Sequence, residues 1–140
     1  MYYANHYGMN DGLISDLERT LNGEYNAIVC YEQLAKLADQ EEERNRILEI
    51  RKDEIKHFHI FSHIYISLTG RQPRPQLTGP CPSDYAAGLN SSFKDEQNTN
   101  DFYRQVADKT LNPFIREQFK RAAADEQNHA VWFLYFLSRR

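Results

Sequence analysis

The sequence predicts an all-α protein, a four-helix bundle in which a long crossover joins two antiparallel hairpins. Three observations predict this fold. Apolar side chains recur every three or four residues in long segments, and no segment shows the alternation of a β-strand. Glycine and proline fall mainly between these segments. The second half of the chain also repeats the pattern of the first half, with an offset of 72 residues.

The composition indicates a single domain spanning residues 1–140. Hydrophobic residues make up 41% and charged residues 26% of the 140-residue chain, which is ordinary for a globular protein. The net charge of −3 does not favour nucleic acid or an anionic membrane as a partner. The apolar stretch "AVWFLYFL" is far shorter than the ~20 residues that span a bilayer. With no signal-peptide pattern at the start, we expect a cytoplasmic protein without a membrane segment.

Breaks in the apolar periodicity define four helices. "NDG" precedes the first periodic segment, "ADQEEE" interrupts the pattern once, and "GRQPRPQLTGPCP" holds four of the five prolines. The fifth proline, in "LNPF", marks the last break. The expected helices are about 12–39, 41–69, 83–111 and 113–139, with a crossover at 70–82.

The crossover determines how the two hairpins are joined. Very short turns connect the first helix to the second and the third to the fourth, which favours antiparallel pairs. Thirteen extended residues reach about 43 Å, and a helix of 28 residues is about 42 Å long. The crossover can therefore run the length of the bundle, so that the second and third helices are parallel.

Six ionisable residues occupy positions that the periodicity assigns to the core. Each half has a glutamate on its first helix and Asp-Glu-x-x-His on its second, and a tyrosine follows the first glutamate by seven residues. Five pairs match at the single offset of 72: Glu24 with Glu96, Tyr31 with Tyr103, Asp53 with Asp125, Glu54 with Glu126, and His57 with His129. Five matches at one offset are hard to attribute to chance.

This pattern indicates a metal site. The i, i+3 spacing of Glu54 and His57, and of Glu126 and His129, puts both side chains on one helical face. Four carboxylates in a core are too costly without compensation, and bound cations supply it. Oxygen and imidazole ligands without thiolates favour iron or manganese over structural zinc. Two metal ions bridged by carboxylates are the simplest arrangement.

With these motifs, the chain resembles the ferritin-like diiron carboxylate superfamily, and most of all its rubrerythrin and bacterioferritin branches. The resemblance covers residues 12–139, and it implies two iron ions, with manganese or zinc as substitutes. It implies metal ligands at Glu24, Glu54, His57, Glu96, Glu126 and His129, of which Glu54 and Glu126 bridge the two ions. It also implies that Asp53 and Asp125 each hold a histidine tautomer, and that Tyr31 and Tyr103 donate hydrogen bonds to the terminal carboxylates of the opposite hairpin.

The chain departs from these relatives in several places. Rubrerythrins carry an additional glutamate where this chain has Thr99, whose counterpart in the first half is Ala27. No rubredoxin domain accompanies the bundle, so a separate electron donor is expected. The chain stops at "FLSRR" without a fifth helix, which favours a homodimer over a storage shell. No heme is expected, because Met1 and Met9 both precede the first expected helix.

The remaining cysteines and histidines are interpreted as ordinary residues. Cys30 and Cys81 are far apart in sequence and suggest no disulfide framework. Cys30 is expected to be a small buried filler, and Cys81 to be exposed among prolines. His59 and His63 lie off the core-facing positions and are expected on a solvated or interface face.

These features lead to three hypotheses about function. The first is a non-heme diiron oxidoreductase in which ferrous iron reacts with hydrogen peroxide or dioxygen. The second is iron binding or buffering without catalysis, or partner binding on a retained fold. The third is substrate oxygenation, which needs an apolar pocket beside the metals.

Overall fold

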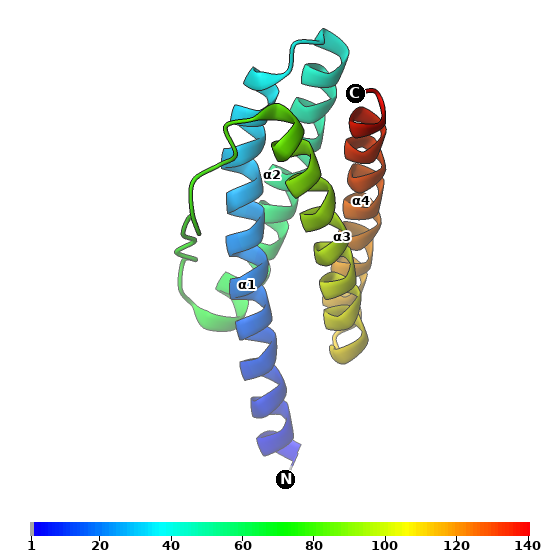
Figure 1. The fold of residues 1–140 in the computed structure, drawn as a ribbon. Coiled ribbons are helices and arrows are strands. Elements are labelled where there is room, and N and C mark those ends of the chain that lie inside the picture. The colour runs from blue at the N-terminus through cyan, green and yellow to red at the C-terminus, as the bar shows by residue number, and fades with distance from the viewer. Residues whose placement is uncertain (1) are drawn as a thin grey trace.

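The computed structural model describes the backbone of residues 2–140 and the side chains from Asp11 onward. It contains four helices: α1 (Tyr2–Leu37), α2 (Glu41–Thr69), α3 (Tyr85–Lys109) and α4 (Pro113–Ser138). No strand occurs in residues 2–140. Figure 1 shows the helices as a bundle of two antiparallel hairpins, α1 with α2 and α3 with α4. The predicted all-α, ferritin-like bundle is confirmed.

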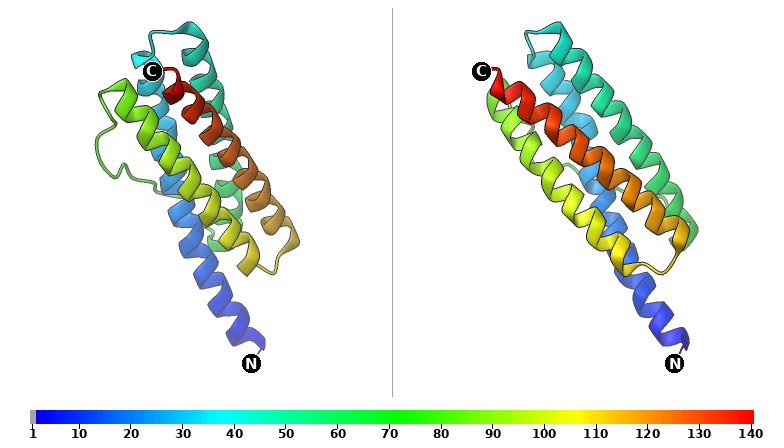
Figure 2. Two further views of the ribbon diagram at one scale, coloured as in Figure 1. Left: turned by 45° about the vertical axis from the view of Figure 1, so that its right-hand side comes forward. Right: turned by 90° about the vertical axis from the view of Figure 1, so that its right-hand side faces the viewer.

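The connection between α2 and α3 sets the topology. Residues 70–84 run back along the outside of α1, so that α3 begins near the end of the bundle where α2 began (Figures 1 and 2). The second and third helices therefore point in the same direction, which a short turn could not achieve. In the assembled bundle α1 also contacts α3, and α2 contacts α4.

Local capping interactions account for most of the helix ends. The Asp84 side chain accepts a hydrogen bond from the backbone N–H of Ala87 at the start of α3, and Asn112 does the same for Ile115 at the start of α4. Pro113 occupies the first turn of α4, where a missing N–H costs nothing. Gly70 ends α2 in the left-handed conformation, with φ of 71°, and its N–H donates to the Ile66 carbonyl.

The start of α1 differs from the prediction. The sequence predicted a first helix from about residue 12, whereas α1 begins at Tyr2 and continues without a break through this position. An internal glycine such as Gly12 costs about 1 kcal/mol in a helix, and this is too little to end a helix of 36 residues. The expectation that no methionine serves a heme rests on Met1 and Met9, whose side chains lie outside the described residues.

The apolar core consists of two clusters. The first contains Leu17, Leu21, Phe61, Tyr103 and Phe119 among others, and the second contains residues such as Tyr31, Leu34, Ile47, Leu89 and Phe133. On every helix the predicted metal-ligating positions fall between the residues of the first cluster and those of the second. The polar layer is thus flanked by apolar side chains on both sides along the bundle.

A buried carboxylate ties the chain terminus to the bundle. Glu43 is fully buried, and it accepts hydrogen bonds from the Tyr85 hydroxyl at 2.7 Å and from the Arg140 guanidinium at 2.9 Å. The sequence suggested only that the acidic run at 41–43 suits a helix N-terminus. In the structure Glu43 links the starts of α2 and α3 to the end of the chain.

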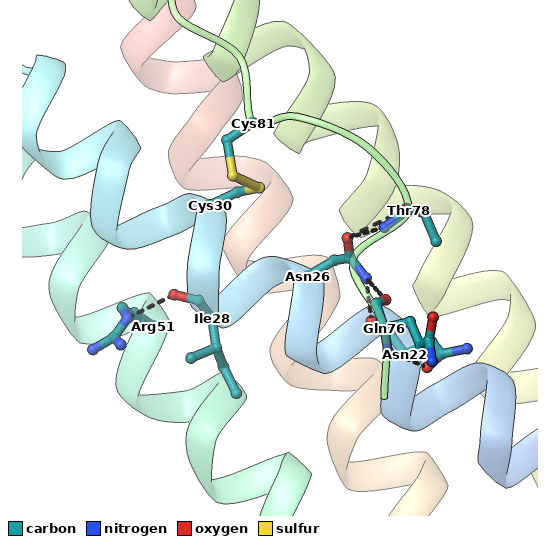
Figure 3. Close-up of a disulfide and its surroundings, with 8 residues drawn as sticks. All are labelled: Asn22, Asn26, Ile28, Cys30, Arg51, Gln76, Thr78 and Cys81. Atoms are coloured by element: carbon teal, nitrogen blue, oxygen red, sulfur yellow. Dashed lines mark hydrogen bonds between the residues drawn. A yellow bond between two sulfur atoms is a disulfide. The ribbon is translucent and has the colours of Figure 1, made fainter. Parts of the chain in front are cut away.

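The two cysteines form a disulfide bond, which the sequence analysis did not predict. Cys30 on α1 is linked to Cys81 in the crossover across 51 residues, and both side chains are half-buried. The expectations that Cys30 is a small buried filler and that Cys81 is an exposed thiol are therefore both wrong. Their pairing could not be seen in sequence, because it depends on the crossover lying against α1, as Figure 3 shows.

Hydrogen bonds from two asparagines also hold the crossover against α1. The Asn26 amide donates to the Gln76 carbonyl at 2.9 Å and accepts from the Thr78 N–H at 3.0 Å. The Asn22 side chain accepts from the Gln76 N–H at 3.0 Å (Figure 3). We refer to residues 76–82, fixed in this way, as the strap.

We expect the disulfide to stabilise the fold substantially. Closing a loop of this length removes enough entropy from the unfolded chain to contribute about 4 kcal/mol. The double substitution Cys30→Ser and Cys81→Ser should lower the free energy of unfolding by about 2–4 kcal/mol, measured by urea denaturation. Oxidised and reduced wild-type protein should differ by the same amount, and equal stability of the two would contradict this account.

None of the helices in residues 2–140 is long and apolar enough to cross a membrane.

Candidate dimetal site

Six buried ligand-type side chains meet between the two apolar clusters. They come from all four helices: Glu24 from α1, Glu54 and His57 from α2, Glu96 from α3, and Glu126 and His129 from α4. Each is at most 3% exposed. The helical period explains this convergence, because each of these residues lies on the core-facing stripe of its helix.

The six side chains form two overlapping groups, each of which could hold a metal ion. One group contains Glu24, Glu54, His57 and Glu126, and the other contains Glu54, Glu96, Glu126 and His129. Within each group, one ligand atom from every residue lies within 4.8 Å of the others. Glu54 and Glu126 belong to both groups, so the structure brings together all six residues that the sequence predicted.

Each histidine points one ring nitrogen at the carboxylates and the other at an aspartate. His57 Nδ1 lies 3.2 Å from oxygens of Glu24, Glu54 and Glu126. Its Nε2 lies 2.8 Å from Asp125, which is on the other hairpin. Because a carboxylate can only accept, Nε2 carries a proton, and in the neutral ring the lone pair of Nδ1 faces the carboxylates.

The second half of the site has the same arrangement. His129 Nδ1 lies 3.2 Å from Glu96, and its Nε2 lies 2.8 Å from Asp53. A lone pair that faces carboxylate oxygens is repelled unless a cation lies between them. The orientation of both rings thus suits either a proton or a metal ion at the centre of each group.

Two tyrosines donate hydrogen bonds to Glu24 and Glu96, each of which belongs to only one of the two ligand groups. The Tyr31 hydroxyl on α1 donates to Glu96 on α3 at 2.6 Å, and the Tyr103 hydroxyl on α3 donates to Glu24 on α1 at 2.6 Å. Each of these two hydrogen bonds joins one hairpin to the other. Burial, followed by the negative charges of the nearby glutamates, raises the pKa of both tyrosines well above the usual value, so the hydroxyls remain donors.

The electrostatics of the site favour added positive charge. Burial, together with the charges of the neighbouring carboxylates, raises the pKa of Glu54 and of Glu126 well above the usual range. Among the residues that the structure describes, no side chain or backbone group forms a hydrogen bond with the buried Oε1 atoms of Glu24, Glu54 and Glu126. Buried carboxylate oxygens without donors are costly, and two divalent cations would offset the four negative charges of the glutamates. The residues therefore fit a pair of metal ions.

A cavity of about 630 Å³ leads to this site from the side of α1, α3 and the crossover. Glu24, Glu54, Glu96 and Glu126 all line it, as do strap residues 78–80 and Pro82. Ala27 and Thr99, the two positions without the additional carboxylate, line it as well. The sequence showed that these side chains are small but could not show that they face a cavity.

Two other histidines of α2 lie away from the site. His59 and His63 are exposed on α2 and belong to neither ligand group. His63 instead lines a separate surface groove with residues of the α3–α4 turn. This placement agrees with the expected solvated face.

We expect the metal-free protein to lose stability as the pH rises. Burial opposes the charged form of His129, but the hydrogen bond and charge of Glu96, the charge of Glu54 and the hydrogen bond of Asp53 outweigh it and raise its pKa to about 9. A histidine with a raised pKa contributes stability that is complete below its unfolded value of 6.5 and is lost as the pH rises through about 9. The raised pKa values of Glu54 and Glu126 act in the same direction, starting from the unfolded value of 4.5.

Thermal unfolding in the presence of a chelator tests this expectation. The Tm of the metal-free protein should fall steadily from pH 6.5 to pH 9, whereas bound divalent metal should remove most of the dependence. A Tm of the metal-free protein that rises over this interval would contradict the proposed protonation of the cluster.

Comparisons with known proteins agree with this geometry. A family model for rubrerythrin matches residues 88–140, which contain most of α3 and all of α4. The uncharacterized protein YhjR of Bacillus subtilis (strain 168) is 51% identical over 128 residues, covering 91% of this chain and 88% of YhjR.

Two solved structures share the fold. The bacterioferritin of Desulfovibrio desulfuricans, a structure of its diiron site in different catalytic states, aligns with a TM-score of 0.81 at 20% identity. That alignment covers 94% of this chain and 81% of the bacterioferritin. A hypothetical protein from Pyrococcus furiosus aligns with a TM-score of 0.78 at 16% identity, over 90% of this chain and 88% of the other. These matches place the chain in one family with YhjR, show that its fold is the ferritin-like four-helix bundle, and show that its second half is similar to rubrerythrin.

Proposed function

We propose that the protein is a non-heme diiron oxidoreductase that reacts with hydrogen peroxide or dioxygen. The observation that carries this proposal is the pair of ligand groups that share Glu54 and Glu126. In this proposal these two glutamates would be ligands shared by both metal ions, and Glu24 with His57 and Glu96 with His129 would complete the two sites. Iron is the proposed metal because the ligands are carboxylates and imidazoles, with manganese or zinc as substitutes.

When bound as ferrous ions, the metal pair supplies two electrons to the oxidant. The protein's own residues prepare the site for this chemistry. Asp53 and Asp125 keep the proton on Nε2 of each histidine, so that Nδ1 is available as a ligand. Tyr31 and Tyr103 orient the terminal carboxylates, and because burial raises their pKa they keep the protons that form these hydrogen bonds.

Apolar layers flank the ligand layer along the bundle. Aromatic contacts close the bundle on both sides of the ligand layer: Phe61 lies against Tyr103 with ring centroids 5.6 Å apart, and Phe133 lies against Tyr31 at 5.2 Å. The cavity under the strap supplies a route for a small oxidant. Its lining combines apolar surface with carboxylates, asparagines and serines, and these polar side chains suit peroxide or hydrated ferrous ions.

Rapid mixing of the anaerobic, ferrous-loaded protein with either oxidant tests this function. We expect oxidation of the bound iron at least tenfold faster than oxidation of free ferrous ions in the same buffer. A faster reaction with peroxide than with dioxygen favours peroxide reduction, and sustained oxidation of many ferrous ions per chain favours ferroxidase activity. Oxidation no faster than in buffer refutes the enzymatic proposal and favours iron binding or buffering without catalysis.

A further inference from the structure

We propose that Cys30 and Cys81 are a redox-active pair whose dithiol form supplies electrons for peroxide reduction at the dimetal site, and that an external dithiol reductant restores them. This inference rests on the proposed function and identifies the electron donor that it requires. Four features of the structure carry it: a shared cavity, a short path to the ligands, a geometry that keeps the sulfurs paired, and partial exposure of the disulfide.

The pair lies next to the proposed metal site. Cys30 lines the same cavity as the four glutamates, and the strap that carries Cys81 forms another part of its wall. Along α1, Cys30 follows Glu24 by six residues, a rise of about 9 Å. The next residue, Tyr31, donates its hydroxyl directly to Glu96. The chain therefore provides a short covalent and hydrogen-bonded path between the sulfurs and the ligand layer.

Contacts other than the disulfide also hold the segment that carries Cys81 against the helix that carries Cys30. Their Cα atoms lie 5.2 Å apart, and Asn22 and Asn26 hold the preceding part of the strap against α1 through backbone and side-chain contacts (Figure 3). These hydrogen bonds do not depend on the oxidation state of sulfur. A reduced pair is therefore kept within reach of renewed disulfide formation.

The fold also makes the dithiol a strong reductant. The folded chain holds the two cysteines together and thereby favours the disulfide over the dithiol, and this preference increases the tendency of the dithiol to release electrons. Both side chains are half-buried and not sealed in the core, so an external thiolate can attack the disulfide. Cys30 thus lines the cavity, and the disulfide still allows attack from outside.

The reaction balances without a further reagent. Conversion of the two thiols to the disulfide breaks two S–H bonds, forms one S–S bond and releases two electrons and two protons. Cleavage of the O–O bond of one hydrogen peroxide molecule to give two water molecules consumes two electrons and two protons. The external dithiol is oxidised to its own disulfide by exchange when it returns the pair to the thiol form.

A stoichiometric experiment tests the inference. Protein with reduced cysteines is loaded anaerobically with two ferrous ions per chain, freed of reductant and mixed with two molar equivalents of hydrogen peroxide. The remaining peroxide is assayed, and free thiols are alkylated in acid and counted by mass spectrometry. We expect both equivalents to be consumed and both thiols to be lost, because the ferrous ions account for the first equivalent and the dithiol for the second.

Two variants and a metal-free sample complete the test. The double variant Cys30→Ser and Cys81→Ser should bind the same amount of iron but consume only one equivalent. Asn26→Ala removes hydrogen bonds of the strap but keeps both cysteines, so this variant should still consume two equivalents of hydrogen peroxide by the end of the reaction. Metal-free wild-type protein should retain its thiols over the same interval.

The outcomes distinguish this inference from the proposed function. If the wild-type protein consumes the first equivalent rapidly and its thiols survive, the dithiol is not the donor, although the oxidoreductase proposal stands. Equally fast thiol loss in metal-free protein would show direct oxidation of the cysteines and would overturn the coupling to the site. If the first equivalent reacts no faster than with free ferrous ions, the proposed function itself is wrong.

Discussion

Replacing Glu54 with alanine should abolish the binding of both metal ions, whereas replacing Glu24 should weaken only one. Glu54 belongs to both ligand groups, and Glu24 belongs to the group of His57 alone. Changes to residues that merely orient ligands typically cost about 10–100-fold in metal affinity, so loss of a ligand common to both ions should cost more than about 100-fold at each. His129→Ala should resemble Glu24→Ala, because it also removes a ligand from only one group.

Titration with Mn²⁺ or Fe²⁺ under anaerobic conditions, followed by elemental analysis after desalting, measures this difference. We expect about two ions per chain in the parent, about one in Glu24→Ala and none in Glu54→Ala. His59→Ala is a matched control, since His59 is exposed on the same helix outside both groups. Retention of two ions by Glu54→Ala would contradict the bridging assignment.

The substitution Glu126→Gln should stabilise the metal-free protein and destabilise the metal-loaded one. Glutamine keeps the shape of the side chain but removes one negative charge from a buried cluster in which burial and the other carboxylates raise the pKa of Glu126. In the presence of chelator the free energy of unfolding should increase on the order of 1–3 kcal/mol. With metal present the variant should lose most of the stabilisation that the parent gains, because a bridging ligand is weakened.

Urea denaturation of parent and variant, once with chelator and once with Mn²⁺, measures the free energy of unfolding in both the metal-free and the metal-loaded state. Glu117→Gln provides the control, because Glu117 is exposed on the same helix beside Arg121 and its loss should change stability by less than about 0.5 kcal/mol. A Glu126→Gln variant that is less stable than the parent under both conditions would mean that the carboxylate is a structural hydrogen-bonding group and not part of a charge cluster that a metal neutralises.

The opposite effects expected of Glu126→Gln on the metal-free and the metal-loaded protein reflect a conflict between the stability of the fold and the binding of metal. The six side chains occupy positions that would otherwise hold apolar residues, such as those of the neighbouring layers at Phe61 and Phe133. Without cations the cluster lowers stability, and with them it becomes a source of stability. The disulfide and the contacts of Glu43 with Tyr85 and Arg140 strengthen the fold elsewhere.

The sequence was sufficient for the fold and for the convergence of the site, because both follow from periodicity. Core-facing positions recur every three or four residues, so the depth of Glu54 or His129 in the bundle follows from its place in the pattern. The internal repeat showed which residues of the first half correspond to which residues of the second half. The resemblance to the ferritin-like proteins implied that Tyr31 contacts the opposite hairpin, and the structure contains this hydrogen bond to Glu96.

The features that the sequence did not show depend on tertiary contacts that leave no periodic pattern in the sequence. The strap lacks regular structure, so nothing in its composition indicates that it lies against α1 or that Cys81 meets Cys30. Glu43 looked like part of an acidic helix start, yet its charge is buried because Arg140, 97 residues later, returns to it. The cavity likewise forms only after α1, α3 and the crossover assemble, and small side chains such as Ala27 and Thr99 line it.

Anomalous scattering at the iron absorption edge, from crystals of protein purified without added metal and then soaked in ferrous salt under anaerobic conditions, tests the central claim most directly. The account predicts two peaks at mid-bundle, one beside Glu24 and His57 and the other beside Glu96 and His129, with Glu54 and Glu126 in contact with both. Peaks confined to surface residues, or electron density in which these carboxylates hold only protons and water, would contradict it.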